Sequence, residues 1–121
     1  MTDRLRDKTA IVVGRGQTPG ETIGNGRATA ITFAREGAKL VIADLDLAAA
    51  EDTVRLVEEA GGEAFAIRGD VTSEEDCARF AKATVDAYGR IDILQNNVGV
   101  GPGDSGPTKI TAEAWRFILD V

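Results

Sequence analysis

Glycine residues gather in one segment near the amino terminus, directly after a short apolar run. Residues 12–30 read VVGRGQTPGETIGNGRATA, a stretch in which glycine recurs between polar residues. When a strand passes through glycines into a helix, free backbone N–H groups and the positive helix end face a phosphate. Glycine is needed there wherever the backbone approaches the ligand closely or adopts positive φ. The segment is therefore a candidate phosphate-binding turn. The dinucleotide spacing G-x-G-x-x-G is not met, however, and the same glycines also suit an ordinary surface loop.

A carboxylate follows the next apolar run, in the sequence VIADLD of residues 41–46. An acidic side chain at the end of a second strand can accept both hydrogen bonds of a ribose diol and repels a 2′-phosphate. Asp44 is thus a candidate ribose ligand that favours NAD over NADP, whereas Arg15 is of the type that binds a 2′-phosphate. Either Asp44 or Asp46 can instead cap the following helix. We expect Asp46 to form the cap and to leave Asp44 free.

Two more polar segments follow later apolar runs, GDVTSEED at residues 69–76 and LQNNVGVG at residues 94–101. Ligands of open α/β sheets bind at the carboxyl ends of the strands. Asp70 is then placed to meet an adenine edge, and residues 97–99 to pass close to an adenosine ribose. Taken singly, these residues are equally well explained as a loop carboxylate and turn-forming asparagines.

These polar segments need a sheet that brings them together, and the apolar pattern predicts one. Runs rich in β-branched residues alternate with segments of helical period. The expected strands cover residues 9–13, 39–43, 63–68 and 91–96. The expected helices cover residues 26–36, the segment from Leu47 to the glycine pair 61–62, the segment from a capping box at Thr72 and Glu75 to Tyr88, and the segment from Thr111 onward.

Strands and helices at this spacing form right-handed parallel crossovers. We therefore expect an α/β fold, a Rossmann-type doubly wound parallel sheet in a three-layer α/β/α arrangement, with residues 1–121 in one domain. The apolar face of the last helix begins at Trp115 and no helix-ending signal follows Val121, and the strand at residues 91–96 would form an apolar sheet edge. Both features lead us to expect a fragment of a larger domain.

Composition excludes several classes of function. The chain of 121 residues has a net charge of −6, which disfavours a nucleic-acid partner. It has no run long enough to span a bilayer and no apolar stretch typical of a signal peptide. Cys77 is the single cysteine, which fits a reducing cytoplasm. The absence of histidine excludes a Ser-His-Asp hydrolase and removes the commonest zinc ligand.

Together, the motifs resemble the short-chain dehydrogenase/reductase family. The matching segments are VVG…IGNGRATAITFAREGAKLVIADLD, GDVTSEED, GRIDILQNNVG and ITAEAWRFILDV, and the resemblance extends from Leu5 to Val121. Its most specific part is Asn-Asn-x-Gly at residues 96–99, which follows Asp-Val at residues 70–71 at the family's spacing. Val13 and Val98 depart from the usual threonine and alanine.

The family's glycine signature is T-G-x-x-x-G-x-G. Gly24 and Gly26 match its last two glycines, and the first is either Gly14 or Gly20. We choose Gly14, because the turn must begin where the strand ends. That choice implies an insertion at or near residues 17–22, which we expect to fold over the cofactor.

The resemblance implies an oxidoreductase that transfers a hydride between a nicotinamide cofactor and an alcohol or carbonyl substrate, with this chain as the cofactor-binding half. It implies NAD as the cofactor, NADP being the less favoured alternative, and a homo-oligomer formed through the helix that begins at Thr111. The cofactor-binding residues that it implies are Gly14, Ile23, Gly24, Asn25, Gly26, Asp44, Leu45, Asp70, Val71, Asn97, Val98 and Gly99.

The family's catalytic serine, asparagine and Tyr-x-x-x-Lys have no match here, so no catalytic residue is assigned. Tyr88 is followed by GRID and lacks the lysine partner, and we expect it to serve packing. Two alternatives stay open. One is a truncated, non-catalytic module that binds a nucleotide or a partner chain. The other is a methyltransferase in which Asp44 binds the ribose of S-adenosylmethionine, although residues 96–99 and the long glycine segment count against it.

Overall fold

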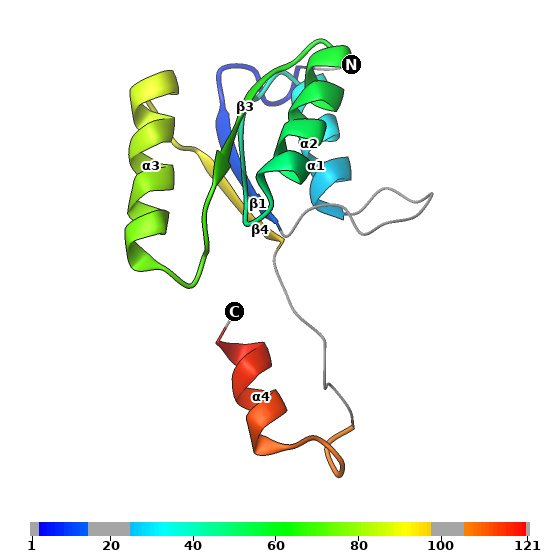
Figure 1. The fold of residues 1–121 in the computed structure, drawn as a ribbon. Coiled ribbons are helices and arrows are strands. Elements are labelled where there is room, and N and C mark those ends of the chain that lie inside the picture. The colour runs from blue at the N-terminus through cyan, green and yellow to red at the C-terminus, as the bar shows by residue number, and fades with distance from the viewer. Residues whose placement is uncertain (1–2, 15–24, 98–105, 121) are drawn as a thin grey trace.

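Strands and helices alternate along the chain in the computed structural model, which describes residues 3–14, 25–97 and 106–120 (Figure 1). The strands are β1 (Thr9–Gly14), β2 (Lys39–Asp44), β3 (Glu63–Arg68) and β4 (Ile93–Asn97). The helices are α1 (Asn25–Arg35), α2 (Leu47–Glu59), α3 (Glu74–Tyr88) and α4 (Ala112–Leu119). No helix within these described ranges is both long and apolar enough to span a bilayer.

All strand pairs are parallel, and the strand order is β3-β2-β1-β4. The chain builds outward from β1 to β3 and then crosses back to the far side of β1. Because parallel crossovers are right-handed, this reversal places α3 on the opposite face of the sheet from α1 and α2. Figure 1 shows these helices on the two sides of the sheet. The α/β fold with a doubly wound parallel sheet is confirmed.

The strand ends lie level with one another at the carboxyl edge of the sheet. Gly14 pairs with Asp44 on one side and with Asn97 on the other. Asp44 in turn pairs with Arg68 at the end of β3. This register brings segments that are far apart in the sequence to one edge.

The core has two halves, one on each face of the central strands. Alternate residues of β1 and β2 point to opposite faces, and both sets are buried, as expected for strands between two helix layers. The half under α1 and α2 contains Ala10, Val12, Leu40, Ile42, Ala30, Ala34 and Val57. The half under α3 contains Ile11, Val13, Val41, Ala43 and Phe80.

The capping box expected at Thr72 and Glu75 is wrong. The N-cap of α3 is Ser73, whose hydroxyl accepts from the Asp76 backbone N–H at 3.2 Å. The Thr72 hydroxyl instead donates to Asp70 Oδ1 at 2.7 Å. The Thr72 hydroxyl, which was expected to cap the helix, is therefore hydrogen-bonded to the Asp70 carboxylate.

The fourth strand begins at Ile93, two residues later than expected at residue 91. The residue before it, Asp92, is tied to the start of β1 through both its backbone and its side chain. Its backbone N–H donates to the Thr9 carbonyl, and its carboxylate accepts from the Thr9 N–H at 2.9 Å and from Arg90 at 2.6 Å. This hydrogen bond between Asp92 and Thr9 comes directly before the first paired residues of β4 and β1.

Gly62 lets β3 begin close to α1. A Cβ atom built at this position would lie 2.6 Å from the Cβ of Ala34 and 3.0 Å from a methyl carbon of Val57. The preceding Gly61 has φ of 87°, in the left-handed region that commonly ends a helix. The two glycines thus have separate roles, one in ending α2 and one in close packing.

We expect Gly62→Ala to lower the free energy of unfolding by about 1–3 kcal/mol, because the added methyl group overpacks the contact with Ala34. Gly106→Ala is the matched control, since a Cβ atom there meets nothing within 4 Å. Its effect should stay within about 0.5 kcal/mol. Urea denaturation followed by circular dichroism measures both, and equal effects would contradict the packing role of Gly62.

Asp92 should make stability depend on pH. The hydrogen bond from Arg90, and then that from the Thr9 N–H, hold the pKa of Asp92 below its ordinary value. Such a carboxylate stabilises the fold above its unfolded-state pKa of about 3.9, and the stabilisation is lost as pH falls through the lower folded-state pKa. We expect Asp92→Asn to lower the urea midpoint at pH 7. The difference from the wild type should shrink below about pH 4, and a difference that stays constant would refute this linkage.

Candidate functional site

Residues from three strands and two helices converge at the carboxyl edge of the sheet. They surround a small cavity of about 30 Å³, which is lined by Val12, Gly14, Gly26, Arg27, Ile42, Asp44, Thr53 and Asn97. Gly14, Gly26, Asp44 and Asn97 belong to the set expected from the sequence, and the structure brings them together. The cavity is far smaller than the roughly 300 Å³ or more of a typical ligand pocket. It therefore marks where the residues meet, not the extent of a binding site.

Asp44 ends β2 beside Gly14, and the residue is only 4% exposed. Its Oδ1 accepts from the Asp46 backbone N–H at 2.9 Å. The expectation that Asp46 leaves Asp44 free is wrong, because an aspartate readily accepts from the N–H two residues later. The other half of that expectation is confirmed, since Asp46 caps α2 by accepting from the Ala49 N–H at 3.2 Å. Asp44 is thus held at the strand end by its own loop, with a carboxylate that offers about four lone-pair positions.

The first turn of α1 is tied to α2 by Arg27. Its Nε donates to Thr53 Oγ1 at 3.0 Å, and its Nη2 donates to the Ala49 carbonyl at 3.2 Å. Sequence reasoning missed Arg27 and Thr53 as residues of this cavity. The only signal for Arg27 was its position directly after Gly26, and Thr53 gave none, because it looks like any polar residue within a helix.

Gly26 allows the Asn97 side chain to lie against the first turn of α1. A Cβ atom at Gly26 would lie 2.9 Å from Asn97 Nδ2. Asn97 also lines a second hollow, of about 460 Å³, along the β4 side of α1, where Asn25 is among its neighbours. The start of α1 and the end of β4 therefore line one hollow together.

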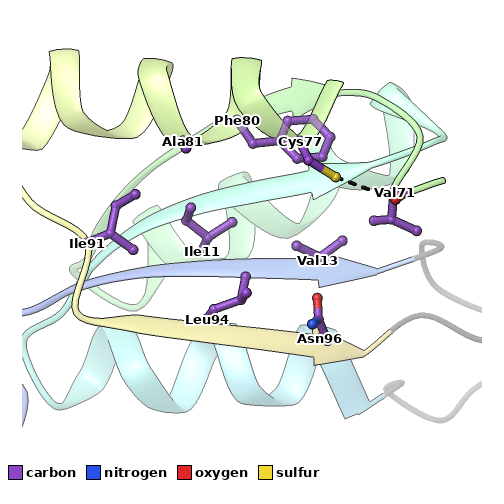
Figure 2. A pocket seen from close by; sticks show the side chains of 9 residues that line it. All are labelled: Ile11, Val13, Val71, Cys77, Phe80, Ala81, Ile91, Leu94 and Asn96. Carbon is purple, nitrogen blue, oxygen red and sulfur yellow. Dashed lines mark hydrogen bonds between the residues drawn. The ribbon is translucent and has the colours of Figure 1, made fainter. Parts of the chain in front are cut away.

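Asp70 and Val71 lie away from this cavity, in the loop between β3 and α3. Asp70 Oδ1 accepts from the backbone N–H of Thr72 at 2.8 Å as well as from its hydroxyl. These hydrogen bonds hold the pKa of Asp70 below its ordinary value. The Val71 side chain faces a different, apolar cavity on the α3 side of the sheet, together with Val13 (Figure 2). Leu45 follows Asp44 and is 47% exposed.

Tyr88 packs at the end of α3, as expected. Its ring centroid lies 5.6 Å from that of Phe65, and its hydroxyl donates to the Leu40 carbonyl at 3.4 Å. Burial raises the pKa of Tyr88 to about 12. Ile23, Gly24, Val98, Gly99 and the insertion at residues 17–22 lie outside the described residues, so their expected roles stay predictions.

Comparisons with known proteins point in one direction. The protein-family model described as enoyl-(acyl carrier protein) reductase matches residues 21–121. The 7α-hydroxysteroid dehydrogenase of Escherichia coli strain K12 is 41% identical over 98 residues, which cover 81% of this chain and 36% of that protein. Cyclohexanol dehydrogenase of Acinetobacter sp. strain SE19 is 27% identical over 121 residues, which cover 100% of this chain and 46% of that protein.

Solved structures agree with these matches. A putative short-chain dehydrogenase/reductase from Burkholderia xenovorans superposes with a TM-score of 0.86 at 41% identity, covering 97% of this chain and 44% of that one. A 7α-hydroxysteroid dehydrogenase complexed with NADH and 7-oxo glycochenodeoxycholic acid gives a TM-score of 0.82 at 35% identity. The match covers 99% of this chain and 44% of that one. The chain thus spans less than half the length of these proteins.

We expect Gly26→Ala to displace the Asn97 side chain while the fold is retained, because the clash falls on the end of a movable amide. The side-chain amide resonances of Asn97 in a ¹H–¹⁵N spectrum should shift. Stability should change by no more than about 1 kcal/mol, since alanine has the higher helix propensity. Gly106→Ala is again the control, and unshifted Asn97 resonances in Gly26→Ala would contradict the contact.

Proposed function

The chain belongs to the short-chain dehydrogenase/reductase family, and we propose that it is the cofactor-binding portion of an NAD-dependent oxidoreductase. The reaction is hydride transfer between the nicotinamide and an alcohol or carbonyl substrate. The names of two relatives support that substrate class, since a hydroxysteroid and cyclohexanol are both alcohols. The observation that carries the proposal is the convergence of Gly14, Gly26, Asp44 and Asn97 at one edge of the sheet.

The place of this convergence supports a dinucleotide ligand. The chain leaves β1 toward β2 and later returns to the other side of β1 to form β4. In open α/β sheets, ligands bind at such a reversal, outside the carboxyl ends of the strands. Gly14 and Asn97 are paired at that point, and α1 begins there with its positive end. We assign the diphosphate to this position, with Gly14, Ile23, Gly24, Asn25 and Gly26 around it.

We assign the adenosine ribose to Asp44. Its carboxylate is held at the end of β2 by the Asp46 N–H, so its orientation is set before a ligand arrives. A carboxylate accepts hydrogen bonds from the two ribose hydroxyls and repels a 2′-phosphate, which is why we propose NAD over NADP. Leu45, Asp70 and Val71 would then lie toward the adenine, and Asn97, Val98 and Gly99 toward the ribose.

In this proposal the chain binds and orients the cofactor, and the nicotinamide supplies or accepts the hydride. Proton transfer is assigned to no residue of this chain. A homo-oligomer formed through α4 and a cytoplasmic location complete the proposal. A nucleotide-binding module without catalysis would use the same contacts and would differ only in turnover by the intact protein.

Titration calorimetry of the chain with NAD, NADP and S-adenosylmethionine tests the proposed ligand. We expect saturable heat with NAD and weaker binding of NADP. S-adenosylmethionine should give no heat. If the wild-type chain, shown to be folded by circular dichroism, binds none of the three or binds S-adenosylmethionine best, the cofactor assignment is wrong.

Asp44→Asn should weaken NAD binding about tenfold or more, because hydrogen bonds to a charged acceptor contribute about 1.5–3 kcal/mol. The substitution keeps an acceptor for the Asp46 N–H, so the loop is preserved. Asp44→Asn should also lower the ratio of NAD affinity to NADP affinity. Asp46→Asn is the matched control: it removes the same charge two residues away and retains a good N-cap, and its NAD affinity should equal that of the wild type. If the two variants bind NAD with equal affinity, Asp44 does not bind the cofactor.

A further inference from the structure

A basic residue and a buried threonine join α1 and α2 beside the candidate site. The two helices pack on the same face of the sheet (Figure 1). From the first turn of α1, Arg27 Nε donates to Thr53 Oγ1 at 3.0 Å, and its Nη2 donates to the Ala49 carbonyl at 3.2 Å. The Thr53 hydroxyl donates to the same carbonyl at 3.2 Å. This hydroxyl therefore serves both as an acceptor and as a donor, and Thr53 is only 6% exposed.

Neither residue is the choice that its helix alone would favour. Thr53 lies on the face of α2 that carries Ala50 and Val57 into the core, where an apolar side chain would need no hydrogen-bond partner. Arg27 lies in the first turn of α1, and a positive charge there is unfavourable beside the positive end of the helix dipole. Departures from local preference are expected at functional sites. The pair therefore indicates a role beyond the packing of the two helices.

A chain of hydrogen bonds, passing through the backbone of Ala49, leads from Arg27 to the Asp44 carboxylate. Arg27 donates to the carbonyl of Ala49, and the N–H of Ala49 donates to Asp46 Oδ1 at 3.2 Å. The N–H of Asp46 in turn donates to Asp44 Oδ1 at 2.9 Å. At the other end, Arg27 directly follows Gly26, and both line the cavity that Asp44 also lines. The start of α1 is thus connected to Asp44 through α2.

The other contacts between the two helices are apolar. Strand pairing sets Gly14 beside Asp44, but it does not determine where α1 begins relative to the end of β2. Ala30 and Ala34 of α1 share a core cluster with Ala50 of α2. Apolar contacts are not directional, whereas hydrogen bonds define a distance and an angle. Among the described residues, the hydrogen bonds of the guanidinium are therefore the contacts that set the separation of the helix starts.

We propose that Arg27 and Thr53 are positioning residues that set the spacing between the two parts of a dinucleotide site. The inference rests on the proposed function, which assigns the diphosphate to the start of α1 and the adenosine ribose to Asp44. In this role the two residues act through the helices and bind no part of the ligand themselves. A ligand that spans both parts depends on their spacing, because its second contact forms at an effective concentration that the first contact sets. A ligand that fills one part alone does not.

Three ligands separate the spacing of the site from the general stability of the fold. NAD spans both parts, adenosine fills the ribose part, and inorganic pyrophosphate fills the diphosphate part. Their affinities for the full chain are measured by titration followed in ¹H–¹⁵N spectra. Thr53→Val removes the hydroxyl at nearly the same volume and leaves the charge of Arg27 in place. We expect it to weaken NAD binding about tenfold, while the affinities for adenosine and pyrophosphate stay within about twofold of the wild type.

Two further variants of the same pair separate the hydroxyl and the guanidinium from the charge. Thr53→Ser keeps the hydroxyl and should restore most of the NAD affinity. Arg27→Lys keeps the positive charge but lacks the planar guanidinium, so it should weaken NAD binding about as much as Thr53→Val does. It also gives the same comparison if Thr53→Val does not fold.

Thr84→Val is the matched control for the loss of a buried hydroxyl. Thr84 lies on α3 and is fully buried, and its hydroxyl donates to the Phe80 carbonyl at 2.7 Å. Like the Thr53 hydroxyl, it donates to a carbonyl four residues earlier, but this hydrogen bond stays within one helix. Thr84→Val should therefore bind NAD with the affinity of the wild type, even where its stability falls.

Three outcomes would overturn the proposal for a wild-type chain that binds NAD. One is that Thr53→Val and Arg27→Lys, shown to be folded by circular dichroism, bind NAD as tightly as the wild type. Another is that adenosine and pyrophosphate lose as much affinity as NAD, which would indicate a general loss of structure. The third is that Thr84→Val weakens NAD binding as much as Thr53→Val does. A folded wild-type chain that binds no NAD would instead overturn the proposed function, and this inference with it.

Discussion

Burial of β1 and β2 on both faces is the constraint on which the rest of this structure depends. Strands that carry apolar side chains on both faces need a helix layer on each side of the sheet. A chain with right-handed crossovers can supply both layers only by reversing its direction across the sheet. That reversal brings β4 next to β1 and sets Asn97 beside Gly14. The meeting of the candidate site residues is thus a consequence of covering the two central strands.

The elements whose signal is an apolar run or a glycine were predictable from the sequence. β3 was placed at its observed bounds, and the cap of α2 by Asp46 was expected and is found. The errors are local hydrogen bonds in which several acceptors compete. Thr72 and Ser73 can both cap α3, and the choice depends on the Asp70 carboxylate, which takes the Thr72 hydroxyl. Residue types alone do not settle a competition among neighbours a few residues apart.

The candidate site was predictable where backbone position decides it and less so where side chains do. Gly14 and Asp44 end paired strands, so their proximity follows from the parallel register. The direction of a side chain is a different matter. The resemblance implies Val71 only as a cofactor-binding residue, and it does not indicate that the Val71 side chain lines the apolar cavity on the α3 side of the sheet, as Val13 does. The tie from Arg27 to Thr53 joins two helices that the sequence shows only as separate periodic segments.

Among the strands that the structure describes, β4 differs from β1 at the switch point, because it pairs with a neighbour on one side only. On its α1 face it presents Ile93 and the amides of Gln95 and Asn97, and on its α3 face Leu94 and Asn96. Each face of β4 thus begins with an apolar side chain and ends with an amide at the carboxyl edge of the sheet. Asn97 lies against the start of α1, at the edge where the candidate site residues meet. Ile93 packs against the half of the core under α1 and α2, whereas Leu94 on the other face is 58% exposed. One strand therefore contributes both to the core, through Ile93, and to the candidate site, through Asn97.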